Sequence, residues 1–149
     1  MAKLTNGTGS FIDLNIGENS VVMDGADTVV AWKINGKICY AIEGYAAVTG
    51  SAVQWVRDGL KFIKSSGEIE ALAESVPDTN GVYFVPALAG LGAPYWDMYA
   101  RGAIVGITRG TTQNHIIRAA EESIAYQSYD LVHAMELDVG QPITALKVD

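Results

Sequence analysis

A short glycine-rich segment near the start of the chain has the composition of an anion-binding turn. Gly7 and Gly9 flank Thr8, and a predicted strand begins directly afterwards at Ser10. Two glycines around a hydroxyl residue allow backbone N–H groups to point into one concavity, and the Thr8 hydroxyl adds a donor. No Lys-Ser or Lys-Thr pair, third glycine or helix follows, so the segment matches neither a P-loop nor a dinucleotide-binding turn. An ordinary glycine-rich turn remains the alternative interpretation.

A second candidate pair lies on a predicted helix. Gly50 and Gln54 are four residues apart and therefore share one helix face. A glycine on that face would let a flat or bulky ligand approach the backbone, and the Gln54 amide offers both a donor and an acceptor. The alternative is close helix–helix packing at Gly50 beside a solvated Gln54. The apolar face of the same helix is a different one, formed by Val53, Val56, Leu60 and Ile63.

A third candidate is the aperiodic loop 86–101, which is rich in glycines and aromatic residues. Long loops of this kind carry a site or pack as a small core of their own. The sequence favours the second interpretation, in which Tyr95, Trp96 and Tyr99 form an aromatic mini-core. Asp97 and Arg101 are then expected to pair with each other or to cap backbone groups within the loop.

The remaining reactive side chains do not form a recognisable catalytic or metal-binding pattern. His115 and His133 have no carboxylate or second histidine at ligand spacing, so both are predicted to be plain helix residues. The single Cys39 excludes an internal disulfide and a cysteine-based zinc site, and its strand position predicts a small core residue. No nucleophile elbow and no pair of catalytic carboxylates can be singled out, and no metal ligand is predicted.

Composition narrows the class of protein further. The 149 residues correspond to one domain, and 49% apolar against 18% charged residues excludes a disordered chain. A net charge of −7 disfavours nucleic-acid binding, which requires a surplus of Lys and Arg. No run of about 18 apolar residues could span a membrane, and the polar start lacks the apolar core of a signal peptide. A cytoplasmic location is expected.

The periodicity of apolar residues predicts a mixed α/β fold in which helices cover a sheet. The segment Met1–Ser10 is polar and glycine-rich and gives the first strand no partner. Asn35-Gly36 between two alternating runs is a strong hairpin signal, so the N-terminal third is predicted to be an antiparallel meander. Thr111 or Thr112 can cap a long helix that Gly140 ends, with a core stripe of Ile117, Ala120, Ile124, Leu131 and Met135. Strands are predicted over 10–15, 28–34, 37–42, 82–85, 103–107 and 144–148, and helices over about 45–64, 68–75 and 111–137.

The succession of motifs resembles the C-terminal domain of the FGGY carbohydrate kinases over nearly the whole chain. The most specific run is Gly90-Leu91-Gly92-Ala93-Pro94-Tyr95-Trp96-Asp97. The resemblance also rests on Gly7-Thr8-Gly9-Ser10-Phe11, Tyr40-Ala41-Ile42-Glu43-Gly44, Gly50-Ser51-Ala52-Val53-Gln54, Val82-Tyr83-Phe84-Val85-Pro86, Ala100-Arg101-Gly102, Thr108-Arg109-Gly110, His115-Ile116-Ile117-Arg118, Glu122-Ser123-Ile124-Ala125-Tyr126-Gln127 and Leu146-Lys147-Val148-Asp149.

The resemblance implies the actin/hexokinase-like, ribonuclease H-like ATPase fold. Residues 1–149 would form part of the C-terminal, nucleotide-binding domain, cut at both ends. Thr8, with Gly7 and Gly9, matches the family segment that approaches the nucleotide phosphates, and Gly50 and Gln54 match residues lining the nucleotide pocket. Phe11 matches the aromatic residue that packs against the carbon chain of glycerol.

The activity implied is transfer of the γ-phosphate from Mg²⁺-bound ATP to a primary hydroxyl of glycerol, which gives glycerol 3-phosphate. The family's catalytic aspartate lies upstream of the Gly-Thr-Gly turn, so no catalytic residue is assigned here and the chain alone is expected to be inactive. The missing N-terminal domain, ATP and a polyol are the expected partners, without nucleic acid or membrane, and the full-length protein is expected to be a homo-oligomer. The alternatives are a kinase for another polyol or sugar, a non-catalytic nucleotide-binding or interaction module, and a purely structural domain.

Three positions depart from the family pattern. Glu121 stands on the core stripe, where an apolar residue is usual. We expect either that Arg118 pairs with it or that this surface meets another domain or subunit. Asp13 is polar at a usually apolar strand position, and Leu88-Ala89 replaces a more usual Phe-Thr. These departures weaken the assignment to glycerol relative to another polyol or sugar and leave the family assignment largely unaffected.

Overall fold

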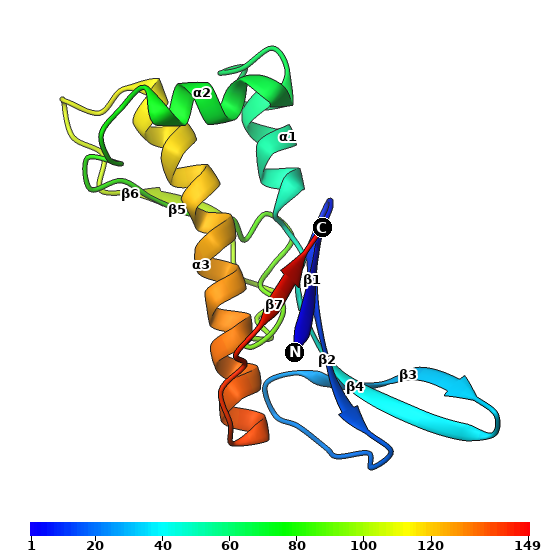
Figure 1. Cartoon of the computed structure of the whole chain (residues 1–149). Coiled ribbons are helices and arrows are strands. Elements are labelled where there is room, and N and C mark those ends of the chain that lie inside the picture. The colour runs from blue at the N-terminus through cyan, green and yellow to red at the C-terminus, as the bar shows by residue number, and fades with distance from the viewer.

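Four antiparallel strands at the start of the chain build most of the central sheet in the computed structural model, which describes residues 1–149 (Figure 1). These strands are β1 (Ala2–Asn6), β2 (Ser10–Gly17), β3 (Asp27–Ile34) and β4 (Lys37–Ala46). The last strand, β7 (Leu146–Val148), pairs with β1 in parallel, so the sheet is mixed and its order is β3-β4-β2-β1-β7. The antiparallel strands predicted after Ser10 and the final strand are confirmed. The predicted meander is wrong, because β2 pairs with β4 and not with β3, the next strand along the chain.

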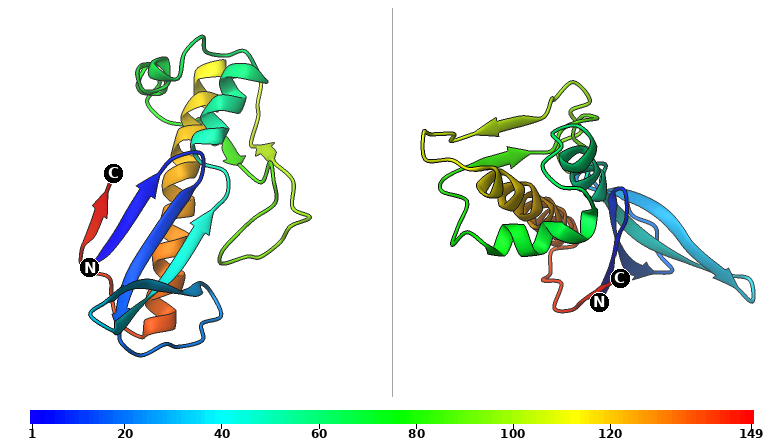
Figure 2. Two further views of the ribbon diagram at one scale, coloured as in Figure 1. Left: turned by 90° about the vertical axis from the view of Figure 1, so that its right-hand side faces the viewer. Right: turned by 90° about the horizontal axis from the view of Figure 1, so that it is seen from above.

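The β3–β4 hairpin follows directly from the Asn35-Gly36 signal. Both residues have positive φ, 51° for Asn35 and 82° for Gly36, which is the backbone conformation that a two-residue hairpin turn needs. The hairpin extends beyond the rest of the molecule (Figures 1 and 2). Cys39 on this hairpin is therefore half-buried, and the prediction that it is a core residue is wrong.

The segment before Gly7 was expected to leave the first strand without a partner, and this is wrong. Ala2 and Leu4 are buried and alternate with the exposed Lys3, as in a strand with one covered face. Two apolar residues are too few to give a periodic signal. The strand forms because β2 and β7 supply hydrogen-bonding partners on both of its edges.

Helices and a two-stranded ribbon form the second half of the molecule. The helices are α1 (Gly50–Asp58), the 3₁₀ turn η1 (Ser66–Glu68), α2 (Ile69–Glu74) and α3 (Gln113–Val139). The strands β5 (Tyr83–Val85) and β6 (Ala103–Val105) pair with each other, apart from the main sheet. Helix α1 is shorter than predicted and ends before Leu60, because the chain turns at Lys61, where φ is 60°. None of the helices combines the length and apolar composition of a membrane span.

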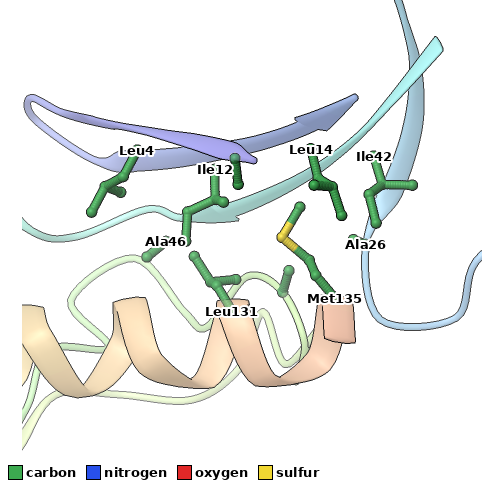
Figure 3. Close-up of a cluster of buried hydrophobic side chains, with 10 residues drawn as sticks. Leu4, Ile12, Leu14, Ala26, Ile42, Ala46, Leu131 and Met135 are labelled. Atoms are coloured by element: carbon green, nitrogen blue, oxygen red, sulfur yellow. The ribbon is translucent and has the colours of Figure 1, made fainter. Parts of the chain in front are cut away.

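The long helix α3 connects two buried clusters. Its C-terminal half presents Leu131 and Met135 to one face of the sheet, where they meet Ile12, Leu14 and Ile42 (Figure 3). Its N-terminal half packs Ile117 against α1, α2 and the β5–β6 ribbon. Ile124 lies between the clusters and is only half-buried, so the prediction that it belongs to the core stripe is wrong. There the helix turns Ser123 inward instead and ties its Gln127 side chain to the Val48 carbonyl at 2.9 Å.

Both ends of α3 are set by the residues that the sequence indicated. Thr112 is the N-cap, and Gly140 ends the helix in the left-handed conformation with φ of 68°. His115 is more than the predicted plain helix residue, because its Nδ1 accepts the Thr112 backbone N–H at 2.9 Å and completes a capping box.

The aromatic loop does not form the predicted mini-core. Tyr95, Trp96 and Tyr99 are 56%, 45% and 88% exposed. The loop is instead held by close backbone packing, since a Cβ on Gly92 would lie 2.6 Å from the Tyr45 carbonyl oxygen. Capping by Asp97 is confirmed, because its carboxylate accepts the N–H groups of Tyr99 and Ala100, whereas Arg101 bonds to backbone carbonyls and not to Asp97.

Candidate functional site

The turn Gly7–Thr8–Gly9 rests on the N-terminal end of α1. The N–H of Gly50 donates to the Gly7 carbonyl at 3.0 Å, and the N–H groups of Thr49 and Ser51 donate to the Thr8 carbonyl at 3.2 and 3.0 Å. The Ser51 hydroxyl donates a third hydrogen bond to the Thr8 carbonyl, at 2.9 Å. The free N–H groups at the start of α1 are thereby used to hold the two carbonyls of the turn.

This anchoring leaves donors of the turn available to a ligand. Gly7 N–H closes the turn by donating to the Gly9 carbonyl at 2.9 Å. The N–H groups of Thr8 and Gly9 and the Thr8 hydroxyl donate no hydrogen bond within the chain, and Thr8 is exposed. Three unused donors on adjacent residues, with their carbonyls fixed from behind, are suited to the oxygens of an anion.

The glycines at this turn are required for close approach of backbone to backbone. A Cβ on Gly9 would lie 2.6 Å from the Ala46 carbonyl oxygen, and a Cβ on Gly50 would lie 2.3 Å from the Gly7 carbonyl oxygen. The space beside Gly50 is therefore filled by the turn. The structure therefore shows close packing at Gly50, which was the alternative to a ligand contact at this residue. The packing partner is the Gly7–Thr8–Gly9 turn and not a second helix.

Gln54 lies one helical turn further along α1, about 6 Å from Gly50 along the helix axis. Its side chain is exposed and makes no hydrogen bond within the chain, as the solvated alternative predicted. The structure thus places the Thr8 turn and Gln54 along the same end of α1. None of the concavities that this chain forms is lined by either residue, so the two lie on an open surface.

A buried polar cluster beneath the turn was not predicted from the sequence. Ser10 and Thr49 are almost fully buried, and Ser10 Oγ lies within hydrogen-bond distance of two acceptors, Asn6 Oδ1 at 2.6 Å and Thr49 Oγ1 at 3.0 Å, of which its single proton serves one. Thr49 is the N-cap of α1, yet its hydroxyl faces the turn rather than capping the helix. The signal that could have located it is a threonine directly before Gly50, the residue at which α1 begins.

Phe11 lies on the face of the sheet that α3 leaves open. Its ring is 40% exposed and stacks on Tyr45, with centroids 5.6 Å apart and an interplanar angle of 20°. Asp13 lies on the same open face, which explains why this strand position tolerates a carboxylate even though Glu43 on β4 lies directly opposite. Burial and the neighbouring Asp13 and Asp27 carboxylates raise the pKa of Glu43.

Arg118 does not pair with Glu121, and that prediction is wrong. Its guanidinium donates to Glu122 one turn along α3, at 2.9 Å, and to the carbonyl of Val76 beyond α2, at 2.7 Å. Glu121 is half-buried without a partner, and burial together with the Glu70 and Glu74 carboxylates raises its pKa.

Glu121→Gln is therefore expected to stabilise the chain at neutral pH, by about 0.5 kcal/mol. The native state holds the Glu121 proton more tightly than the unfolded chain does, so this carboxyl costs stability as the pH rises above its unfolded pKa. The gain should disappear near pH ~3, more than one unit below the unfolded pKa, where both states are protonated. Urea unfolding at both pH values measures it. Glu122→Gln, which breaks the Arg118 pair, is the control, and equal effects of the two variants would contradict the assignment.

Comparisons with known proteins identify the family. Residues 2–149 match the model of the C-terminal domain of the FGGY family of carbohydrate kinases. The chain is 57% identical to glycerol kinase 2 of Thermotoga maritima and 59% identical to glycerol kinase 2 of Saccharolobus solfataricus, over 100% and 99% of its length. It spans about 30% of the length of each of these relatives.

Solved structures agree with the sequence comparisons. Plasmodium falciparum glycerol kinase with ADP superposes with a TM-score of 0.89 at 39% identity, covering 99% of this chain and 30% of that one. A xylulose kinase from Lactobacillus acidophilus shares the fold, with a TM-score of 0.81 at 23% identity, over 99% of this chain and 29% of that one. The predicted mixed α/β, actin/hexokinase-like fold is confirmed. By the match over residues 2–149, the chain belongs to the FGGY family of carbohydrate kinases.

Proposed function

We propose that this chain is the nucleotide-binding part of an ATP-dependent glycerol kinase. The full protein would transfer the γ-phosphate of ATP to a primary hydroxyl of glycerol and release glycerol 3-phosphate. The observation that carries the proposal is the anchored turn with its three free donors, in a chain 57% to 60% identical to glycerol kinases. The relative solved with ADP supports a nucleotide as the ligand.

Each residue of the site has a definite part in this proposal. The N–H groups of Thr8 and Gly9 and the Thr8 hydroxyl bind phosphate oxygens and stabilise the charge that moves during phosphoryl transfer. Gly9 and Gly50 allow the backbone contacts that hold these donors in place, and Gly7 supplies the carbonyl that accepts the Gly50 N–H. Gln54 lines the nucleoside side of the site, and the exposed Phe11 ring packs against the carbon chain of the polyol.

Mg²⁺ is proposed to reach the site with the nucleotide. No three His, Cys, Asp or Glu side chains of this chain converge as metal ligands, so the residues present do not form a metal cage of their own. Mg²⁺ commonly binds through substrate phosphates and only one or two carboxylates, which is compatible with this donor set. The catalytic base and the remaining polyol contacts are proposed to lie in the part of the kinase that this chain does not span.

The wider properties of the full protein follow the same proposal. An N-terminal domain would close over the open surface that carries Thr8 and Gln54, and the complete enzyme would be a cytoplasmic homo-oligomer. The chain alone would then bind nucleotide without turning it over. Incubation of the purified chain with glycerol and Mg²⁺-ATP should yield no glycerol phosphate above the blank.

Thr8→Val in the full-length kinase is expected to lower kcat/KM for ATP by at least ~10-fold, because it removes one phosphate donor without changing the size of the side chain. A coupled assay measures this loss, and running it with glycerol, xylulose and gluconate as acceptors identifies the preferred substrate at the same time. Thr8→Ser keeps the hydroxyl and should retain most of the activity. Equal activity of the valine and serine variants would contradict the role of the hydroxyl, and a preference for another acceptor would contradict glycerol.

A further inference from the structure

The outer side of the C-terminal half of α3 carries a groove that the proposed reaction does not use. Its larger part has a volume of about 390 Å³ and its smaller part about 200 Å³. Tyr95 and Asp130 line both parts, so the two are neighbours on either side of the Tyr95–Asp130 hydrogen bond, and together they are here termed the α3 groove. The groove runs past Tyr126 at one end and Leu137 at the other.

Apolar side chains along the α3 groove are unusually exposed. Tyr126 is 51%, Tyr95 56% and Leu137 70% exposed. Tyrosine combines a large apolar ring with a polar tip and is enriched where proteins bind one another. From Tyr126 to Leu137 the helix rises about 16 Å, which matches roughly five residues of an extended peptide.

The aspartates that line the α3 groove give it a negative charge. Asp24, Asp130 and Asp138 line it, and no lysine or arginine does. His133 is the one other titratable side chain there apart from the tyrosines. Between Ala119 and Val139, α3 carries no lysine or arginine and five acidic residues, namely Glu121, Glu122, Asp130, Glu136 and Asp138.

The groove carboxylates are held in place and still have free acceptor oxygens. Asp130 Oδ2 accepts the Tyr95 hydroxyl at 2.7 Å, and Asp138 Oδ2 accepts the Gly25 N–H at 3.2 Å. The Oδ1 atoms of both residues accept no hydrogen bond within the chain, and neither does the Asp24 carboxylate. Fixed carboxylates with an open oxygen bind guanidinium or ammonium groups with little loss of side-chain freedom.

We propose that the α3 groove docks a cationic amphipathic peptide segment of a partner protein. Arginine or lysine side chains would bind Asp130, Asp138 and Asp24, and intervening apolar side chains would pack on Tyr95, Tyr126 and Leu137. Arginine gains further from stacking on the tyrosine rings. A second copy of this chain fits less well, because it would bring the same acidic groove against itself.

The test is binding of a fluorescent peptide in which arginine and leucine alternate, followed by anisotropy on the 149-residue chain. Asp130→Asn with Asp138→Asn should weaken binding at least ~10-fold, since both charges are lost while each amide oxygen can still accept the existing bond. Tyr126→Ala should also weaken it. The matched control, Glu18→Gln with Glu70→Gln, changes the net charge equally outside the groove and should leave affinity within about twofold.

Several outcomes would overturn the proposal. One is unchanged affinity of the Asp130→Asn, Asp138→Asn variant when thermal melting shows it to be folded. Another is equal binding of a peptide in which glutamate replaces arginine, which would leave only apolar adhesion. A third is a concentration-dependent dimer that Tyr126→Ala abolishes, which would assign the groove to a second copy of the chain.

Discussion

Replacing Gly50 by alanine is expected to displace the phosphate-binding turn and to abolish nucleotide binding. The new Cβ would lie 2.3 Å from the Gly7 carbonyl oxygen and 3.2 Å from the Gly7 carbonyl carbon, so the turn must move. Movement breaks the hydrogen bonds from Thr49, Gly50 and Ser51 that fix its carbonyls. At about 1 kcal/mol for each lost bond, the free energy of unfolding should fall by about 2–4 kcal/mol.

Nucleotide affinity of the full-length kinase should fall by more than ~100-fold in the same variant, because all three donors shift together. Urea unfolding and calorimetric titration with ADP measure the two effects. Gly67→Ala is the matched control, since a Cβ there would meet no atom closer than 4.0 Å. If Gly50→Ala and Gly67→Ala behaved alike in both measurements, the turn would not depend on contact with α1.

The second large effect is expected from Leu131→Ala. Leu131 is 1% exposed and joins α3 to the sheet beside Met135 and Ile12 (Figure 3). Truncation of a fully buried leucine removes its transfer free energy and leaves a cavity, at a cost of about 3–5 kcal/mol. For a chain of this size the melting temperature should fall by roughly 10 °C.

Leu137→Ala provides the comparison on the same helix. Leu137 is 70% exposed, so its truncation should cost less than about 0.5 kcal/mol. Thermal unfolding of both variants by circular dichroism measures the difference. A Leu131→Ala variant as stable as Leu137→Ala would contradict the assignment of the main core to the α3–sheet contact.

Regular elements could be predicted from the sequence where local signals and tertiary packing agree. Asn35-Gly36 indicated the β3–β4 hairpin because only a few residue types adopt positive φ at two successive positions. Thr112 and Gly140 marked the ends of α3 because capping depends on neighbouring residues only. These features are local in the chain and could be read without the fold.

Features that depend on distant contacts could not be predicted in this way. Strand β1 forms because β7, more than a hundred residues later, pairs with it. Tyr95 and Trp96 were expected in a core because aromatic residues usually bury their area, yet glycine packing holds their loop. Arg118 donates hydrogen bonds to Glu122 and to the Val76 carbonyl beyond α2 and not to Glu121. This arrangement depends on the position of α2 in the fold, which the local sequence does not give.

The candidate site shows the same division. The composition of Gly7-Thr8-Gly9 indicated an anion-binding turn, and the family resemblance raised Gly50 and Gln54 to candidates. The function of Gly50 as a platform for the turn required the structure, because residues 7 and 50 are brought together only by the fold. The buried Ser10 and Thr49 hydroxyls beneath it were hidden for the same reason.

The most direct test of the nucleotide-binding proposal is an amide NMR titration of this chain with ADP up to millimolar concentration. The Thr8 and Gly9 backbone amides and the Gln54 side-chain amide are expected to show the largest shifts, while the Gly67 amide stays in place. Signals of Thr8, Gly9 and Gln54 that remain unchanged throughout the titration would contradict a phosphate-binding function of the turn.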